Sequence, residues 1–594
     1  MKNKTTSSLG FFNYFKKIIG WHIYGYILLN FLVGLLDGLG LAMFIPLLAL
    51  ATGTEGGGES LGNLQFLVDL ITKIGLELNL MTTLGFMVSL FLFKGVFYYL
   101  RSIYFIKIRL KTIRTVRIRL IEGLKSLSYS GFTKMEAGKL QNNMIGETGK
   151  LVGAMTFYFN TMQHIVMVMT YVVLAFSANW KFAVMVGLGG VITNIFYKYI
   201  NKITQRYARK QSLLGHDFNG DLIQVINHFK YLKATTYFKA FEKKLQDNIW
   251  MVEEISFRIG RIGSIAESLR EPLIIVVISG VILFQVNVMG GDFSSILVSL
   301  LLFYRALAHL ASMQNAWNGF LTNSAGLESI ETLLLQFTKY KELQYSENIE
   351  EIGEIKVENV SVKYDSKEVL KEVTFSIPKK TSVAFVGESG AGKTTLANVI
   401  CGLMTPNQGS VWVSGKSVYA SDLDSYRKRI GYITQEPVVF NDTIFNNVTF
   451  WAEKTEEALA KFHKIMEMVS LKDFMEGLNQ KEDTVLGHNG ILISGGQKQR
   501  ISIARELYKD VELMILDEAT SALDSETEKH IKESIDMLQG KFTMIIIAHR
   551  LSTVKNVDQV YLMEKGEIIN HGTFSELLNK SERFRKMVEL QEVG

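Results

Sequence analysis

The sequence has little cysteine and little net charge. Its single cysteine, Cys401, excludes an intrachain disulfide and a cysteine metal cluster. Cys401 lies in an apolar, helix-like stretch, where a packed core thiol is expected. The net charge is only +6 over 594 residues, which argues against a nucleic-acid binder. No small-residue cleavage site follows the first apolar run, so no cleavable signal peptide is expected.

Charged residues are also scarce in the first half of the chain. The mean hydropathy of the whole chain is nevertheless only +0.16, because charge density rises after about residue 340. The chain therefore consists of two unlike parts in series. The sequence shows neither a second copy of the later part nor an internal repeat of it.

Six apolar stretches in the first part are each near or above the roughly 20 residues that a helix needs to cross a bilayer. They are predicted to be membrane spans over residues 22–52, 80–106, 150–178, 180–204, 270–290 and 293–322. Residues 1–20 carry aromatic residues and lysines at helical spacing. This pattern is typical of a helix in the membrane interface, and it is compatible with the cytoplasmic start of the first span.

Basic residues set the orientation of these spans. They cluster after the second and fourth spans, whereas the glycine-rich loop 53–79 holds one basic residue, Lys73. The positive-inside rule then places both chain termini in the cytoplasm. The long connections 107–149 and 205–269 keep helical periodicity, so they are predicted to be cytoplasmic extensions of the spans.

The pattern changes at about residue 354, where short strands and helices begin to alternate. We therefore predict a membrane domain over 21–343, a polar linker over 344–353 and an α/β domain over 354–594. The fold class is an α-helical polytopic membrane domain, with six transmembrane helices and long cytoplasmic extensions, fused to an α/β P-loop ATPase domain.

A glycine-rich loop organises the second part. It fits the pattern G-x-x-x-x-G-K-[ST], between an apolar strand and a helix that starts near Thr395. Glycine lets the backbone wrap a phosphate closely, and the loop N–H groups and the helix N-terminus attract the anion. Lysine adds a full charge, and the threonine hydroxyl suits Mg²⁺. The loop comprises Gly387, Glu388, Ser389, Gly390, Ala391, Gly392, Lys393 and Thr394, and Thr395, the next residue, is also predicted to bind ATP.

Further polar residues follow two other apolar strands. Asp517 and Glu518 end one strand, and His549 ends another, so they are expected to meet at the carboxyl edge of the sheet. Asp517 suits Mg²⁺ coordination, and Glu518 suits a general base on water. His549 is either a functional or a structural histidine. A second glycine turn, residues 493–497, opens an apparent helix and is either an anion site or a plain loop.

Together these residues resemble the ATP-binding cassette of ABC transporters over about 354–590. Residues 493–497 resemble the signature sequence, with isoleucine in place of leucine, and residues 521–524 resemble the D-loop. Gln435 resembles the glutamine that contacts Mg²⁺, and Tyr364 the aromatic residue that stacks on adenine. His549 resembles the histidine that reads the γ-phosphate.

The first part is similar to the six-helix domain of type I ABC exporters. Residues 129–140 and 232–245 resemble its two coupling-helix regions. One departure is His488, which stands where these exporters usually carry an acidic residue before the signature. The resemblance leaves open whether His488 makes coupling pH-dependent or lies in a solvated loop.

The resemblance implies a half-transporter that works as a dimer and uses ATP and Mg²⁺. Each chain carries the full set of motifs, which favours a homodimer. Glu518, His549 and Gln435 are the implied catalytic residues, and Thr394, Gln435 and Asp517 the implied Mg²⁺ ligands. The nucleotide would also be contacted across the dimer by Ser494, Gly495, Gly496 and Gln497.

Ionisable residues within the spans point to the transported substrate, because they are costly at membrane depth. The candidates are Lys94, Arg101, Arg270 and Arg305. Arginine forks match phosphate oxygens, so these residues suit a phosphate or pyrophosphate head group. The alternatives are structural pairing, for example of Asp37 with Arg305, and snorkelling to the membrane surface.

Parts of the first and sixth spans look similar to bacterial lipid flippases, of the PglK type for lipid-linked oligosaccharides and of the MsbA type for lipid A. This similarity implies ATP-driven flipping of a lipid-linked, pyrophosphate-bearing oligosaccharide across the bacterial inner membrane. The alternatives are flipping of lipid A and export of drugs or peptides by the same architecture. Expected partners are a second copy of the chain, membrane lipids and the lipid-linked substrate, with no nucleic acid.

Overall fold

The computed structural model describes residues 8–44, 46–47, 50, 73, 77, 79–178, 180–289, 293–364, 367–517, 539–548 and 550–592. The chain forms two compact units. The helical unit comprises Met1–Leu127 and Gly131–Lys341, and the α/β unit comprises Ser128–Ser130 and Glu342–Gly594.

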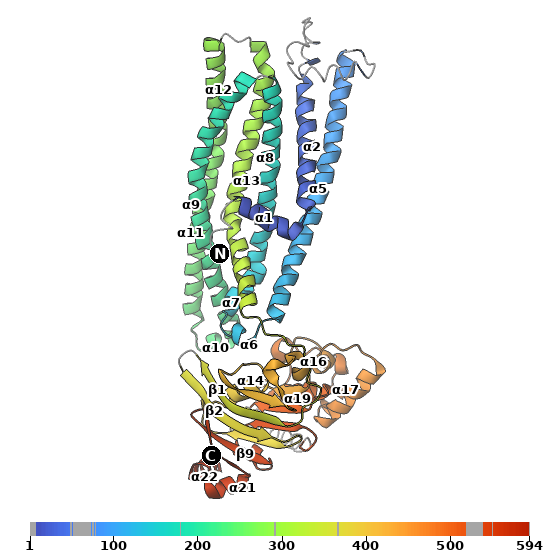
Figure 1. Cartoon of the computed structure of the whole chain (residues 1–594), viewed down its shortest axis with the longest axis vertical. Coiled ribbons are helices and arrows are strands. Elements are labelled where there is room, and N and C mark those ends of the chain that lie inside the picture. Colours follow the sequence, from blue (N-terminus) through green and yellow to red (C-terminus); the bar gives the residue numbers. More distant parts are fainter. Residues whose placement is uncertain are drawn as a thin grey trace. The chain divides into compact units, whose positions relative to one another are not determined.

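Long helices and a few short ones build the helical unit (Figure 1). They are α1 (Ser8–Ile19), α2 (His22–Ala42), α5 (Leu80–Lys125), α6 (Tyr129–Phe132), α7 (Ala137–Asn142), a π-helical turn (Asn143–Glu147), α8 (Thr148–Ala178), α9 (Trp180–Asn227), α10 (Phe229–Ala234), α11 (Phe238–Ser268), α12 (Arg270–Met289) and α13 (Phe293–Lys339). The starts of α2, α5, α8, α9, α12 and α13 lie within two residues of the predicted span starts. Among the described residues, three stretches are long and apolar enough to cross a membrane: His22–Ala42, Leu80–Lys125 and Ala137–Phe176.

Several of these helices continue far beyond the predicted spans. α5 runs on to Lys125, α9 to Asn227 and α13 to Lys339. This agrees with the helical periodicity that the sequence keeps in the connections. The first region expected to hold a coupling helix, 129–140, begins with the short helix α6. The second, 232–245, overlaps the end of the short helix α10 and the start of α11.

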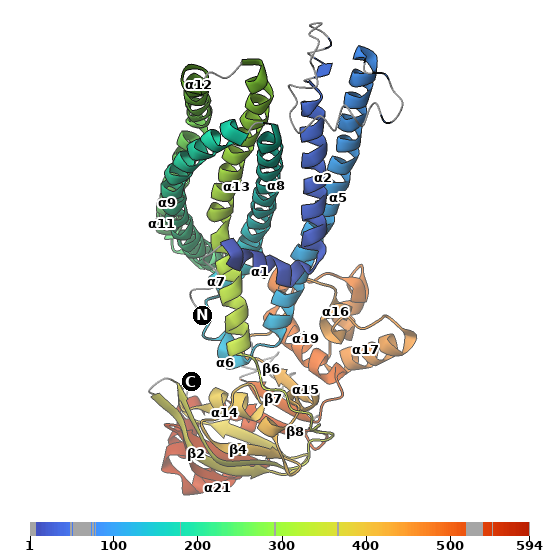
Figure 2. The same ribbon diagram turned by 45° about the horizontal axis from the view of Figure 1, so that its top comes forward.

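Small residues bring the spans close together. A Cβ atom at Gly38 of α2 would lie 2.2 Å from Cδ1 of Leu174 on α8, so a larger residue here would force the Leu174 side chain to move. Gly319 of α13 likewise lies against Phe157 of α8, where an added Cβ would meet the ring at 2.6 Å. α13 and α8 pack along much of their length, and α2 packs on α5 (Figure 2).

The N-terminal helix α1 is amphipathic, as its aromatic spacing predicts. Phe11, Phe15 and Ile19 are buried. The Phe11 ring meets that of Phe320 on α13 edge to face, with ring centroids 4.7 Å apart. α1 therefore packs its aromatic side on the unit itself, and its place in the membrane interface stays a prediction.

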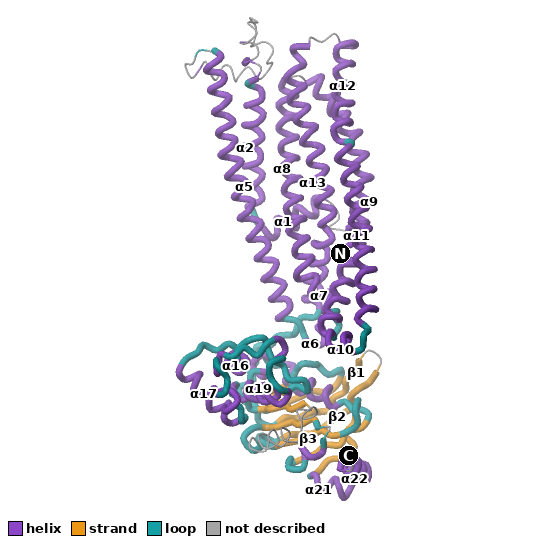
Figure 3. The backbone as a smooth tube through the Cα atoms, turned by 180° about the vertical axis from the view of Figure 1, so that it is seen from behind, coloured by secondary structure: helices purple, strands orange, loops and turns teal. Residues whose placement is uncertain are grey.

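Two sheets form the α/β unit, with the strands in orange in Figure 3. The six-stranded sheet has the order β10-β9-β3-β8-β7-β6, and the four-stranded antiparallel sheet has the order β2-β1-β4-β5. The strands are β1 (Ile355–Tyr364), β2 (Lys367–Ile377), β3 (Ser382–Val386), β4 (Gln408–Val413), β5 (Lys416–Ser417), β6 (Ile430–Ile433), β7 (Leu513–Asp517), β8 (Thr543–Ile547), β9 (Gln559–Glu564) and β10 (Glu567–Gly572). In β3, β7 and β8 every residue is buried, as expected for central parallel strands.

Helices accompany the two sheets in the α/β unit. They are α14 (Lys393–Ile400), α15 (Leu423–Arg427), α16 (Ile444–Thr449), α17 (Glu456–Met468), α18 (Lys472–Glu476), α19 (Gly495–Tyr508), α21 (Phe574–Lys580) and α22 (Glu582–Glu592). Cys401 follows α14 and is 4% exposed, which confirms the predicted core thiol. Burial raises the pKa of this thiol, so it is neutral and unreactive.

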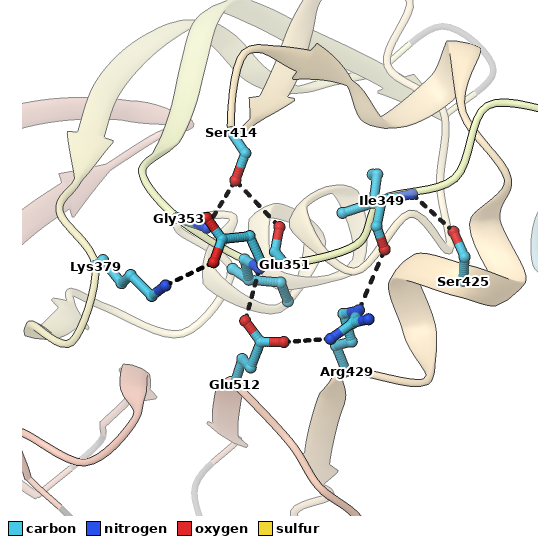
Figure 4. A network of polar contacts seen from close by, with 9 residues as sticks. Ile349, Glu351, Gly353, Lys379, Ser414, Ser425, Arg429 and Glu512 are labelled. Atoms are coloured by element: carbon cyan, nitrogen blue, oxygen red, sulfur yellow. Dashed lines mark hydrogen bonds and ion pairs between the residues drawn. The ribbon is translucent and has the colours of Figure 1, made fainter.

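The segment predicted as a polar linker, 344–353, is part of the α/β unit (Figure 4). Ile349 and Ile352 are buried in its core, at 1% and 0% exposed. The Ile352 N–H donates to Glu512 Oε2 at 2.8 Å, and Arg429 Nε donates to the Ile349 carbonyl at 3.2 Å. We call residues 342–353 the strap. The sequence suggests a linker because polar residues surround the two buried isoleucines.

Candidate functional site

Adjacent strands bring the predicted nucleotide residues to one edge of the larger sheet. β3, β8, β7 and β6 are parallel neighbours in that order. Phe385 pairs with Ile547, Ile547 with Asp517, and Leu516 with Ile433, so the four strands end level with one another. The phosphate loop follows β3, Gln435 follows β6, and Asp517 is the last residue of β7. Glu518 comes directly after β7 in sequence and His549 two residues after the end of β8, and both lie outside the described residues.

The phosphate loop has the backbone that its glycines predict. Gly390 and Gly392 have φ angles of 83° and 101°, in the left-handed region that favours glycine. A Cβ atom at Gly387 would lie 2.2 Å from the Met563 carbonyl oxygen, so this position has no room for a side chain. The loop is therefore held close against the end of β9.

Lys393 is the first residue of α14 and is only 5% exposed. Its ammonium group donates to the carbonyl oxygens of Gly387 at 2.8 Å and Glu388 at 3.0 Å. The charge thus lies inside the curve of the loop, where a phosphate would need it. Thr394, one residue on, is exposed. This donor set fits a polyphosphate.

Asp517 is buried and accepts a hydrogen bond from the Tyr432 hydroxyl at 3.1 Å. Burial, together with the Asp517 carboxylate, raises the pKa of Tyr432, so the phenol stays a neutral donor. Sequence reasoning missed Tyr432. Its position could have indicated a role, because Tyr432 lies in β6, three residues before Gln435 and on the strand next to β7. A buried carboxylate beside the phosphate loop fits the hard oxygen ligands that Mg²⁺ prefers.

The second glycine turn is a helix N-terminus. Ser494 caps α19, and its hydroxyl accepts from the Gln497 N–H at 3.3 Å. The Gln497 side chain accepts in turn from the Ser494 N–H at 2.8 Å. This reciprocal capping box fixes the turn. Gly495 and Gly496 lie in the first turn of the helix, so their N–H groups have no partner within it.

Other predicted residues of the cassette lie as follows. Tyr364 is 46% exposed, and Gln435 and His488 are exposed. His488 lies in a 3-10 turn, which agrees with the solvated-loop interpretation. Glu388 of the phosphate loop pairs with Arg583 of α22 at 2.8 Å, a contact that the sequence did not suggest. Residues 521–524 lie outside the described residues.

The helical unit holds a polar cluster at the level of the predicted spans. Asp37 is 5% exposed, and its carboxylate lies 2.5 Å from Nζ of Lys94. The Tyr171 hydroxyl donates to the other carboxylate oxygen of Asp37. Arg101 is also buried and donates to Asn30 Oδ1 at 3.3 Å. These five residues form two groups of contacts on α2, α5 and α8, and we call them together the membrane polar network.

This arrangement corrects one alternative from the sequence, the pairing of Asp37 with Arg305. Asp37 takes Lys94 as its ion-pair partner instead. Arg305 lies on α13 and is exposed, and among the described residues it has no carboxylate within salt-bridge distance. Arg270 opens α12, and its side chain lies outside what the structure describes.

Sequence reasoning missed Asn30, Tyr171, His164 and His309 in this region. Helical spacing was the available signal. Asn30 is seven residues from Asp37, Lys94 is seven from Arg101, His164 is seven from Tyr171, and Arg305 is four from His309. Each pair lies on one face of its helix, so four helices each carry a polar stripe.

Replacing Asp37 with asparagine should destabilise the helical unit. The change leaves the partly exposed Lys94 ammonium beside a neutral amide, and loss of this charged hydrogen bond costs about 1.5–3 kcal/mol. Thermal unfolding of the detergent-solubilised protein measures the effect. The double variant D37N/K94M removes both charges and should lose less stability than D37N alone. A double variant that loses as much as the two single changes combined would show that the pair is not coupled.

Comparisons with known proteins agree with this geometry. The family model described as ABC transporter transmembrane region matches residues 25–309, and the model described as ABC transporter matches residues 370–521. The ATP-dependent lipid A-core flippase of Syntrophus aciditrophicus (strain SB) is 28% identical over 518 residues, which cover 85% of this chain and 84% of that protein. The heterocyst differentiation ATP-binding protein HepA of Nostoc sp. is 28% identical over 512 residues, 84% and 82% of the two chains.

Solved structures show the same fold. The structure of a bacterial Atm1-family ABC exporter with ATP bound superposes with a TM-score of 0.80 at 22% identity, and covers 96% of this chain and 98% of that one. The α-helical unit is thus an exporter-type transmembrane domain, and the α/β unit is an ATP-binding cassette. The chain belongs to the ABC transporters, as an ATP-hydrolysing half-transporter that joins one transmembrane region to one ATP-binding cassette.

Proposed function

We propose that the protein is a homodimeric, ATP-driven flippase for a lipid with an anionic head group in the bacterial inner membrane. A pyrophosphate-linked oligosaccharide lipid is the first candidate substrate, and lipid A is the second. The names of the relatives favour a lipid substrate, since several are lipid A-core flippases.

Arg305 is the observation that carries the head-group proposal. Lys94 is neutralised by Asp37, and Arg101 is buried, held by Asn30 and stacked over the Tyr98 ring at 4.2 Å. Arg305 is exposed and unpaired among the described residues. A free guanidinium on a membrane helix matches phosphate oxygens in a bidentate manner. Arg305 would therefore contact the head group, while Lys94 and Arg101 would set the local charge.

The cassette would supply the energy. Lys393 and the loop N–H groups would bind the β- and γ-phosphates, and Thr394, Gln435 and Asp517 would hold Mg²⁺. When bound, Mg²⁺ neutralises charge on the phosphates. Glu518 would orient and deprotonate the attacking water, and His549 would contact the γ-phosphate. Ser494 to Gln497 would close over the nucleotide of the partner subunit, because the helix N-terminus behind them favours an anion.

Charge distribution supports the topology. The extension of α5 beyond its span carries exposed Lys107, Lys111, Arg114 and Arg117, which the positive-inside rule assigns to the cytoplasm. Both termini and the cassette would then be cytoplasmic.

Proteoliposomes with a fluorescent polyprenyl-pyrophosphate oligosaccharide test the proposal. We expect ATP-dependent translocation by the wild type and none by Glu518→Gln. ATP hydrolysis without translocation of this lipid would remove the first candidate substrate. A fluorescent lipid A in the same vesicles then tests the second.

Replacing Arg305 with alanine should reduce flipping at least about tenfold, since one bidentate charged contact contributes roughly 1.5–3 kcal/mol. Basal ATP hydrolysis should stay near the wild-type rate, because Arg305 lies in the transmembrane domain. Arg117→Ala removes an exposed arginine beyond the span and is the matched control. Full flipping by the Arg305 variant would rule out its head-group role.

A further inference from the structure

Two histidines face each other beside the membrane polar network. His164 lies on α8 and His309 on α13, and their Nδ1 atoms are 3.1 Å apart. The Tyr171 ring stacks on the His309 ring, with centroids 5.4 Å apart and planes 15° from parallel. Tyr171 in turn donates to Asp37. The pair is therefore held in place by the same residues that hold the network.

The distance fixes how the pair carries protons. Two ring nitrogens at 3.1 Å share one hydrogen, so one histidine is the donor at Nδ1 and the other the acceptor. A proton from water can add to the free Nε2 of the donor ring, and the N–H···N bond then becomes charge-assisted. A second added proton would sit on the acceptor Nδ1 and point at the first. The geometry thus accepts one extra proton and opposes a second.

Charged groups from three helices act on this pair. They are Asp37 on α2, Lys94 and Arg101 on α5, and Arg305 on α13. Tyr171 on α8 is the neighbouring titratable hydroxyl. With the pair neutral, three cations face one carboxylate. An extra proton raises this positive excess, and an anionic group in the same place offsets it.

We infer that the His164–His309 pair is a proton-binding site that fills when an anionic head group enters the transmembrane domain. This inference rests on the proposed function, because it takes Arg305 as the contact of the head group. Substrate entry would draw one proton from water onto the pair. Release of the head group from Arg305 would return the proton to water.

Linkage gives the sign of the effect. If the substrate favours protonation, protonation favours the substrate by the same factor. Binding of the anionic lipid should therefore tighten as pH falls through the titration of the pair. One linked proton limits the change to about tenfold in Kd per pH unit.

The test is lipid affinity as a function of pH. Full-length protein in phosphatidylcholine nanodiscs is titrated with the fluorescent polyprenyl-pyrophosphate oligosaccharide between pH 5.5 and 8.0. We expect a severalfold to tenfold gain in affinity per pH unit for the wild type. His164→Gln and His309→Gln keep a polar side chain without a titrating ring, and their affinity should be nearly flat with pH. A wild-type slope in both variants overturns the inference.

His22→Gln is the matched control, since His22 also contacts a side chain, the Tyr104 hydroxyl at 2.9 Å, on neighbouring membrane helices. It should keep the wild-type slope. A second measurement tests the proton site even if the histidine variants fold poorly or this lipid does not bind. In wild-type protein labelled with ¹⁵N-histidine, NMR should show that the signals of the pair titrate together, taking up one proton.

The two proposals fail separately. Coupled titration without binding of this lipid would leave the proton site standing and remove the substrate. Lipid binding with a pH-independent affinity would leave the substrate and overturn the proton site. Histidines that titrate independently would also overturn it.

Discussion

The Lys393→Met variant should hydrolyse ATP at least about 100-fold more slowly than the wild type. Lys393 places a charge inside the phosphate loop, 2.8 Å and 3.0 Å from two loop carbonyl oxygens. Methionine keeps the length of the side chain but removes the charge and both hydrogen bonds. A preorganised electrostatic contact of this kind contributes about 10²–10³ in rate.

Phosphate release by the purified full-length protein measures this effect. Lys472→Met, an exposed lysine of α18, is the matched control and should keep the wild-type rate. The variant should unfold at nearly the wild-type temperature, because the glycines and the contact of Gly387 with β9 still shape the loop. Thermal unfolding therefore distinguishes lost catalysis from lost folding. An active Lys393→Met protein would mean that the loop does not bind the phosphates through this residue.

The phosphate loop could be located in the sequence because the residues that shape and charge it are consecutive. The eight residues 387–394 contain both the glycines that shape the loop and the lysine that charges it. The buried strands β3, β7 and β8 are continuous apolar runs, so each could be located, and the rule for parallel sheets then placed their carboxyl ends together. The hydrogen bond of Tyr432 to Asp517 and the ion pair of Glu388 with Arg583 depend on which elements are neighbours in the fold, so they could not be predicted.

The membrane polar network could be predicted only in part. Lys94 and Arg101 were visible as charges on one helix face, but the partner of Asp37 depends on which helices pack together. Gly34 and Gly38 of α2 permit the close approach of α8, and that approach brings Tyr171 to Asp37. Packing of this kind depends on the shapes of side chains on three different helices. The periodicity along one helix carries no information about those shapes.

The strap shows the same limit at a domain boundary. Polar residues surround Ile349 and Ile352, so the composition indicates a linker, whereas both isoleucines are buried. Their partners, Glu512 and Arg429, precede β7 and β6 and lie far away in sequence. Glu512 accepts from the Ile352 N–H and also pairs with Arg429 at 2.5 Å. The cassette therefore begins about twelve residues before its first strand.

A cassette that begins at residue 354, the boundary predicted from sequence, should be much less stable than one that begins at 342. The shorter protein loses two buried isoleucines, each of which contributes about 1.5–3 kcal/mol. It also leaves Glu512 without the Ile352 N–H and Arg427 without Glu342, which it holds through two hydrogen bonds of 2.6 Å and 2.8 Å. We expect a loss of roughly 3–6 kcal/mol, or on the order of 10 °C in Tm.

Urea unfolding of the proteins 342–594 and 354–594 measures this difference. The variant Glu342→Gln in the longer protein isolates the contact with Arg427 and should account for only a small share, because that ion pair is partly exposed. Ile352→Ala in the longer protein should account for a larger share, about 2–5 kcal/mol, since it opens a cavity in the core. Equal stability of the two lengths would mean that the strap only rests on the cassette, and that the cassette core is complete from β1 onward.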